Sequence, residues 1–177
     1  NNLNFLEEND MTILLMLVML FCPLFLGIEG EMAMAEEPKP PVILYLFWGE
    51  GCPHCEDERE FLRKMRKEYP DIEMRWFEIW NHPEFAKLAD ALAKAHNIKA
   101  TSVPITLIGD WHIIGFDGPE NVGAQLLAQL DRCVKNGCQD ALDSLGPQAI
   151  VEKIRSEAAK NEPQAWEYFP AAPPEQK

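Results

Sequence analysis

The pattern of apolar residues begins with a continuous run and continues with a helically spaced stripe. Residues 42–48, VILYLFW, make up the run, and their number and their branched and aromatic side chains are typical of a strand buried on both faces. A helix is predicted next, in which Phe61, Leu62 and Met65 supply the apolar face, and it ends before Tyr69.

The rest of the pattern predicts three more strands and three more helices. A loose alternation of apolar and polar residues indicates strands, and apolar residues spaced by three and four positions indicate helices. Gly109-Asp110 is interpreted as a turn that joins two short strands as a hairpin. In chain order we expect these elements at 72–80 (strand), 83–93 (helix), 101–109 and 111–116 (hairpin strands), 119–134 and 147–160 (helices).

The order β-α-β-α-β-β-α predicts an α/β fold with a mixed central sheet covered by helices, followed by a C-terminal helical extension. A β-α-β unit implies parallel strands, whereas the closing hairpin adds antiparallel ones. The expected organisation is a proline-rich linker at 36–41, the α/β domain at 42–138, the helical extension at 139–162 and a disordered tail at 163–177.

A long apolar stretch precedes this domain. Residues 11–35, MTILLMLVMLFCPLFLGIEGEMAMA, end in the small-x-small sequence Ala33-Met34-Ala35, which is typical of a signal-peptidase site. A cleaved signal peptide and an uncleaved membrane anchor both fit, although the stretch lacks the usual preceding Lys or Arg. Either one predicts an extracytoplasmic location, periplasmic or anchored facing outward. Residues 1–10 receive no structural assignment.

The composition of the 177 residues narrows the class of partner. A formal charge of −13 argues against nucleic acid, because no basic cluster is present to neutralise phosphates. Four of the five cysteines follow the apolar stretch, and an even number of cysteines fits an oxidising compartment.

The sequence Cys52-Pro53-His54-Cys55 lies between the first strand and the first helix. Cys52 takes the N-cap position, where the positive end of the helix dipole favours a thiolate, and Pro53 fits the first helical position. His54 offers a dipole or a positive charge beside that thiolate. Cys55, one turn further on, is placed to resolve a mixed disulfide. The pattern therefore predicts a catalytic redox pair.

Other uses of the pair are weaker but stay open. A structural zinc site needs four ligands, and the only other cysteines of the domain, Cys133 and Cys138, are some eighty residues away. A purely structural disulfide between Cys52 and Cys55 would close a very short loop. A Cu(I) carrier would use the same two thiolates, but only Met65 and Met74 follow the leader. A non-catalytic interaction module would not need the intact pair.

Two motifs together resemble the thioredoxin superfamily. FWGEGCPHC at 47–55 resembles its active-site stretch, and TSVPITLIGD at 101–110 resembles its second motif. The resemblance implies a cis Pro104 against the cysteine pair, with Val103 and Pro104 binding substrate backbone. It implies cysteine-containing protein substrates, no dissociable cofactor and a membrane redox partner that regenerates the pair. The hairpin is similar to that of glutaredoxins and of small exported thioredoxin-like domains.

The sequence indicates the direction of electron flow less clearly than it indicates the redox pair itself. The Pro-His dipeptide and Val103 are similar to those of DsbA-like periplasmic oxidases, but the chain between Cys55 and Pro104 is too short for their helical insertion. Thioredoxins usually have a buried acid where this chain has Leu46, although Glu50 lies close by in the sequence. The balance favours oxidation, with a reductase or isomerase as the alternative.

Three further sets of residues receive structural interpretations. Cys133 and Cys138 are expected to form a structural disulfide, with free thiols or a second redox pair as alternatives. The acidic run 56–60 is interpreted as the solvated start of a helix. Trp76, Trp80 and Trp111 are expected to be buried in the sheet.

Overall fold

The computed structural model describes residues 40–160 and 166–171 of the chain. The expected leader at 11–35 and the segment 1–10 lie outside the described residues, as do positions 36–39 of the expected linker. Among the helices of the described part, none combines the length and apolar character needed to cross a membrane.

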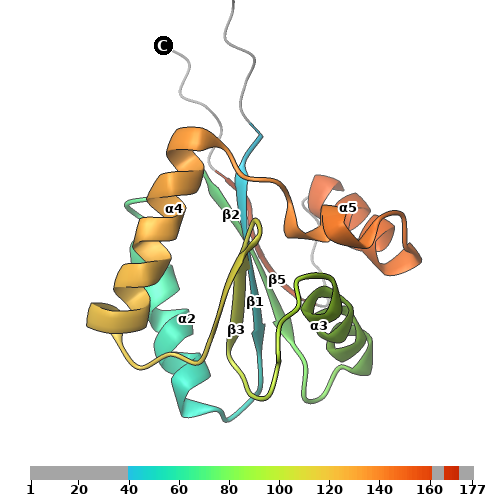
Figure 1. The fold of residues 1–177 in the computed structure, drawn as a ribbon, viewed down its shortest axis with the longest axis horizontal. Coiled ribbons are helices and arrows are strands. Elements are labelled where there is room, and N and C mark those ends of the chain that lie inside the picture. Colours follow the sequence, from blue (N-terminus) through green and yellow to red (C-terminus); the bar gives the residue numbers. More distant parts are fainter. Residues whose placement is uncertain (1–39, 161–165, 172–177) are drawn as a thin grey trace, which may run out of the picture. The chain divides into compact units, whose positions relative to one another are not determined.

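The described chain forms a five-stranded sheet with helices on both faces (Figure 1). The strands lie in the order β4-β3-β1-β2-β5. The β1 and β2 strands are parallel, and the other neighbouring pairs are antiparallel. The strands are β1 (Val42–Trp48), β2 (Ile72–Glu78), β3 (Ile105–Ile108), β4 (Trp111–Ile114) and β5 (Glu167–Phe169).

The main helices lie in two layers, α2 and α4 on one face of the sheet and α3 and α5 on the other (Figure 1). They are α2 (Pro53–Met65), α3 (Pro83–Ala95), α4 (Ala124–Asn136) and α5 (Ala149–Lys160), with a π-helical turn at Pro119–Gly123 and a 3-10 turn at Ala141–Leu145. The predicted fold class is confirmed: the chain has a thioredoxin-like α/β fold followed by a C-terminal helical part.

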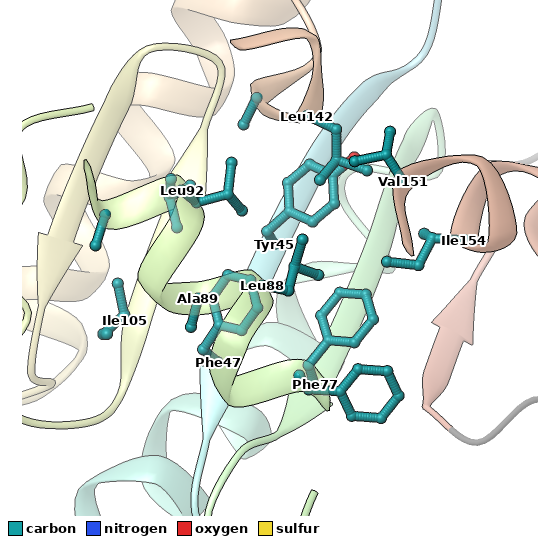
Figure 2. Packing of buried hydrophobic residues seen from close by; sticks show 14 of the residues in the cluster. Tyr45, Phe47, Phe77, Leu88, Ala89, Leu92, Ile105, Leu142, Val151 and Ile154 are labelled. Atoms are coloured by element: carbon teal, nitrogen blue, oxygen red, sulfur yellow. The ribbon is translucent and has the colours of Figure 1, made fainter. Parts of the chain in front are cut away.

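The continuous apolar run of β1 forms the centre of two cores. Leu44 and Leu46 belong to the cluster under α2 and α4. Tyr45 and Phe47 point to the opposite face, where α3 and α5 cover them (Figure 2). A strand with helices on both faces needs apolar residues at successive positions, which explains the absence of alternation in its sequence.

A buried polar network helps to hold the C-terminal helical part on the sheet. The Tyr45 hydroxyl donates a hydrogen bond to Asp140 Oδ1 at 2.6 Å and accepts one from Arg75 Nη1 at 2.9 Å. Asp140 also accepts from the backbone N–H of Leu142 at 2.9 Å and so caps the 3-10 turn. Because the cluster under α3 also includes Val151, the extension shares the core of the domain.

The expectation of a disordered tail at 163–177 is wrong for residues 166–171, and the rest of that range lies outside the described residues. Glu167–Phe169 instead pair with β2 as an antiparallel edge strand. Trp166 packs on Phe77 with ring centroids 4.9 Å apart, and Phe169 packs on Trp76 at 4.5 Å. The strand also supplies hydrogen-bond partners to a β2 edge that would otherwise be open.

Candidate active site

Cys52 and Cys55 lie where β1 leads into α2. The turn between them and the strand passes through Gly51, whose φ of +78° suits glycine better than any other residue. The two cysteines form a disulfide with their Cα atoms 5.3 Å apart. The Cys52 side chain is 7% exposed, whereas Cys55 is 0% exposed. A substrate sulfur can therefore reach Cys52 and not Cys55.

The helix N-terminus donates directly to the reactive sulfur. The backbone N–H of Cys55 donates a hydrogen bond to Cys52 Sγ at 3.2 Å, so Cys52 is the N-cap residue of α2 as expected. Pro53 occupies the first helical turn, where its missing N–H leaves no gap in the helix. This arrangement stabilises negative charge on Cys52 Sγ.

The two sequence motifs meet at Pro104. The Val103–Pro104 peptide bond is cis. Cys52 Sγ lies 3.9 Å from the Val103 carbonyl oxygen. The Pro104 carbonyl oxygen accepts from the Gly115 N–H at 2.8 Å, which fixes this segment to the end of β4.

An open groove of about 590 Å³ runs beside Cys52. Its lining comes from the turn at 51–53, from Ile79 and Trp80 after β2, from one face of α3 and from residues 100–103. The backbone groups of residues 100–102 make no hydrogen bond within the described part of the chain. The groove thus offers unpaired N–H and C=O groups close to the reactive sulfur.

The expectation that Trp80 is buried in the sheet is wrong, whereas Trp76 is buried as expected. The β2 strand ends at Glu78, and Trp80 beyond it is 58% exposed. Its indole ring lies against Gly49, where a Cβ atom would come within 2.2 Å of the ring. Trp80 is therefore one wall of the groove, and Gly49 permits the close approach.

Glu78 joins the two loops that flank the groove. Its carboxylate accepts from the backbone N–H of Glu50 at 3.1 Å, of Trp80 at 3.0 Å and of Asn81 at 2.8 Å. Burial alone would raise the pKa of Glu78, but these three donors outweigh it and hold the pKa below its usual range. No sequence pattern indicates this role, because Glu78 closes a strand like any exposed acid.

Glu58 corrects the interpretation of the acidic run as a solvated surface. Its side chain is 0% exposed, and its Oε1 accepts from Thr106 Oγ1 at 2.6 Å. Oε2 has no hydrogen-bond partner within residues 40–160 and 166–171. Burial raises the pKa of Glu58 to about 7, and the Thr106 hydrogen bond acts in the opposite direction.

The other polar residues near the pair in sequence are exposed. Glu50 Oε2 accepts from Asn81 Nδ2 at 3.2 Å on the outer side of the loop. His54, on the first turn of α2, lines a separate cavity of about 340 Å³ together with Phe61 and Phe116. His54 is thus next to Cys52 in sequence but is not part of the lining of the Cys52 groove.

Cys133 and Cys138 form a second disulfide at the C-terminal end of α4, with Cα atoms 5.0 Å apart. Gly137 ends the helix with a φ of +77° and donates to the Cys133 carbonyl oxygen at 2.8 Å. Cys138 packs on Gly109, at the opposite end of β3 from Pro104. The structure therefore does not bring this pair to the Cys52 groove.

The described residues contain no group of three or more His, Cys, Asp or Glu side chains that could hold a metal ion. No protein-family model matches the chain. No curated protein matches its sequence. Among solved structures, the chain is similar to a glutaredoxin from Archaeoglobus fulgidus, at 25% identity and a TM-score of 0.33, over 44% of this chain and 78% of the glutaredoxin. A Cys-x-x-Cys pair between the strand and the helix of a β-α-β unit is itself typical of a thiol–disulfide oxidoreductase in general.

Proposed function

We propose that this protein is an exported thiol–disulfide oxidoreductase that exchanges disulfides with cysteine-containing proteins through Cys52 and Cys55. One observation carries the proposal. The more accessible sulfur of the pair lies at a helix N-terminus, 3.9 Å from the Val103 carbonyl oxygen, beside an open groove of about 590 Å³. A purely structural disulfide needs neither the groove nor the difference in exposure.

The chemistry is a pair of sulfur exchanges at Cys52. In the oxidising direction, a substrate thiolate attacks Cys52 Sγ, a mixed disulfide forms and Cys55 leaves. A second substrate thiolate then attacks the substrate sulfur of that mixed disulfide, which releases an oxidised substrate and reduced Cys52. In the reducing direction, the Cys52 thiolate attacks a substrate disulfide and Cys55 completes the exchange.

The groove supports a polypeptide as the substrate. The unpaired backbone groups of residues 100–102 can pair with an extended chain, as an exposed strand edge does. Val103, which the cis peptide bond to Pro104 orients, lines the groove next to Cys52 and brings that chain alongside the sulfur. Trp80 offers an aromatic surface to an apolar side chain next to the substrate cysteine.

Local charge supports the oxidising direction. A helix N-terminus stabilises the Cys52 thiolate, and stabilising the reduced form makes the disulfide a stronger oxidant. The nearest downstream acid, Glu56, opposes this effect. Arg59 partly neutralises Glu56 through an ion pair of 2.6 Å and stacks on Trp48 at 3.8 Å from the ring centroid.

The proposal includes a membrane redox partner that regenerates the pair and an extracytoplasmic location provided by the segment 11–35. A quinone-linked oxidase would suit the oxidising direction, and a thiol-transferring membrane protein would suit the reducing one. No dissociable cofactor is needed, because the Cys52–Cys55 disulfide itself accepts the two electrons that are exchanged, and the reduced pair of thiols then holds them.

The first test is the reduction potential of the Cys52–Cys55 pair in the purified protein, equilibrated with glutathione buffers. Alkylation and mass spectrometry of the peptide that contains both cysteines separate this pair from Cys133 and Cys138. A value near −120 mV, as in DsbA, supports an oxidase, and a value near −270 mV, as in thioredoxin, supports a reductase. A potential below about −300 mV, typical of structural disulfides, would contradict both directions.

A cysteine variant tests the substrate class. Cys55→Ser leaves Cys52 free to form mixed disulfides that cannot be resolved within the chain. We expect this variant to accumulate covalent complexes with reducible cysteine proteins, and the matched Cys52→Ser variant to accumulate none. Failure of both variants to trap a denatured, disulfide-containing test protein would argue against the proposed function.

A further inference from the structure

A buried carboxyl group lies one helical turn from the buried cysteine. Cys55 and Glu58 are both 0% exposed and are three residues apart on α2. Residues at this spacing lie on the same face of a helix, with Cβ atoms about 5–6 Å apart. The two side chains therefore share the apolar interior between α2 and the sheet.

Only one of the two carboxyl oxygens of Glu58 makes a hydrogen bond within the described residues. Oε1 accepts from the Thr106 hydroxyl, but Oε2 has no hydrogen-bond partner in the described part of the chain. A buried polar atom without a partner costs stability, and its presence in a close-packed core needs an explanation other than packing. An apolar side chain would fill the same space without that cost.

The surroundings keep the group free of charged neighbours. Thr106 on β3 pairs opposite Leu46 on β1, and Leu46 is apolar. Burial raises the pKa of Glu58 to about 7, the Thr106 hydroxyl opposes this effect, and no charged side chain contributes. Near neutral pH the group can thus both hold and release a proton.

We propose that the Glu58 carboxyl group exchanges a proton with the Cys55 thiol during disulfide exchange. This inference rests on the proposed function and adds a role for a residue outside the Cys-x-x-Cys sequence. The two exposed candidates near the pair are less suitable, because Glu50 bonds to Asn81 and His54 lines another cavity.

The proton transfer balances in both directions. When a substrate thiolate attacks Cys52, the Cys52–Cys55 bond breaks, Cys55 leaves with the electron pair, and protonated Glu58 gives it a proton. When Cys55 closes the disulfide, the Glu58 carboxylate takes the Cys55 proton, the Cys55–Cys52 bond forms, and the substrate sulfur leaves as a thiolate. No oxidant or reductant other than the substrate thiol or disulfide is required.

The test measures how fast glutathione reduces the oxidised full chain as a function of pH. Dividing the rate by the thiolate fraction of glutathione removes the ionisation of the attacking sulfur. In the wild type, we expect this normalised rate to fall as the pH rises through about 7, because only protonated Glu58 donates. In Glu58→Gln we expect a flat profile and a rate roughly 10²-fold lower at acidic pH.

Glu60→Gln is the matched control, because Glu60 is an exposed acid on the same helix that pairs with Lys64 at 2.6 Å. We expect it to keep the wild-type rate and profile. A Glu58→Gln protein with the wild-type profile would overturn the role of Glu58 and leave the proposed function intact. Absence of exchange in the wild type itself would overturn the proposed function.

Infrared difference spectra of the wild-type protein provide a second test that needs no folded variant. The carbonyl stretch of a protonated, buried carboxylic acid is separate from that of a carboxylate. We expect its intensity to titrate near pH 7 in the oxidised protein and to change on reduction of Cys52–Cys55. A signal that is identical in the oxidised and reduced proteins would contradict proton exchange with Cys55.

Discussion

The indole ring of Trp80 lies against the backbone at Gly49, so closely that a Cβ atom at residue 49 would come within 2.2 Å of the ring. Gly49 lies in the turn that leads to Cys52, and Trp80 begins the connection to α3. This contact joins the two sides of the groove and holds a 58% exposed aromatic side chain in place.

We expect Gly49→Ala to impair substrate binding more than stability. The added methyl group displaces Trp80, but an exposed ring can rotate outward, so the free energy of unfolding should change by less than about 1 kcal/mol. The KM for a reduced peptide with an apolar residue beside its cysteine should rise, with little change in kcat. Steady-state kinetics and urea unfolding measure the two effects.

Gly51→Ala is the control for this variant. A Cβ at Gly51 would meet no atom within 4 Å, but φ is +78°, so the cost is backbone strain of roughly 1 kcal/mol. This control should lose stability without a change in Trp80 fluorescence. A Gly49→Ala protein in which the Trp80 ring moves while the KM stays the same would show that Trp80 does not contribute to binding.

Replacement of Glu78 by Ala should destabilise the two loops that flank the groove, one at Glu50 and the other at Trp80 and Asn81. Three backbone N–H groups lose their acceptor, which is comparable to the loss of a helix cap and should cost about 1–2 kcal/mol. Because the folded protein holds the pKa of Glu78 below its usual range, this stabilisation is present at neutral pH and is lost as acid protonates the carboxylate. Urea unfolding at neutral and acidic pH measures both.

Glu50→Gln is the comparison for Glu78→Ala. The Glu50 side chain bonds only to the exposed Asn81 amide, so its replacement should be nearly neutral. If both variants lose the same stability, then general surface charge and not the Glu78 carboxylate holds the loops.

The sequence was sufficient for the order of the strands and main helices from β1 to α5 and for the meeting of the two motifs. Continuous apolar β1 and the helical stripe of α2 are local patterns, and their packing follows the pattern closely. The approach of the Val103–Pro104 segment to Cys52 was expected from the resemblance to the thioredoxin superfamily. The cis Val103–Pro104 peptide bond is described by the structure and has no local sequence signal of its own.

Glu58 was missed because the other acidic residues of the run are exposed. Glu56, Asp57 and Glu60 all face solvent, and an acidic run is on average a solvated surface. The available signal was the spacing 55-58-62-65, which places Glu58 on the same face as the buried Cys55, Leu62 and Met65. Periodicity, given more weight than residue type, would have indicated a buried carboxyl group.

The edge strand β5 was missed for a different reason. Its partner β2 lies about ninety residues earlier, and no local rule connects the two segments. The prolines that flank WEYF suggested disorder, whereas Trp166 and Phe169 gain aromatic partners on the sheet. Pairing across such a distance depends on tertiary contacts that become evident only in the folded chain.

Removal of the second disulfide should lower stability and leave the redox chemistry unchanged. In Cys133→Ala/Cys138→Ala, loss of a short loop closure should lower the free energy of unfolding by roughly 2 kcal/mol. Cys138 packs on Gly109, at the far end of β3 from Pro104, so the potential of Cys52–Cys55 should not move. Urea unfolding and glutathione equilibration measure these quantities. A shift in the potential of more than about 30 mV would contradict the independence of the two pairs.

The pH dependence of stability should report Glu58 independently of catalysis. The folded protein keeps the Glu58 proton up to about pH 7, whereas an ordinary carboxyl group releases it near 4.5. The free energy of unfolding therefore falls as the pH rises between these values, and the change corresponds to roughly 3 kcal/mol.

The Glu58→Gln variant has no proton to release at this position and can still accept from Thr106 through its amide oxygen. We expect the free energy of unfolding of this variant to lack this decrease. The difference in the free energy of unfolding, variant minus wild type, should therefore rise by up to roughly 3 kcal/mol from acidic to mildly alkaline pH. Urea unfolding of both proteins across this range measures the difference, and subtraction cancels the other titrating groups. Parallel pH curves for the two proteins would show that the Glu58 carboxyl group is ionised at ordinary acidic pH, as an exposed acid is.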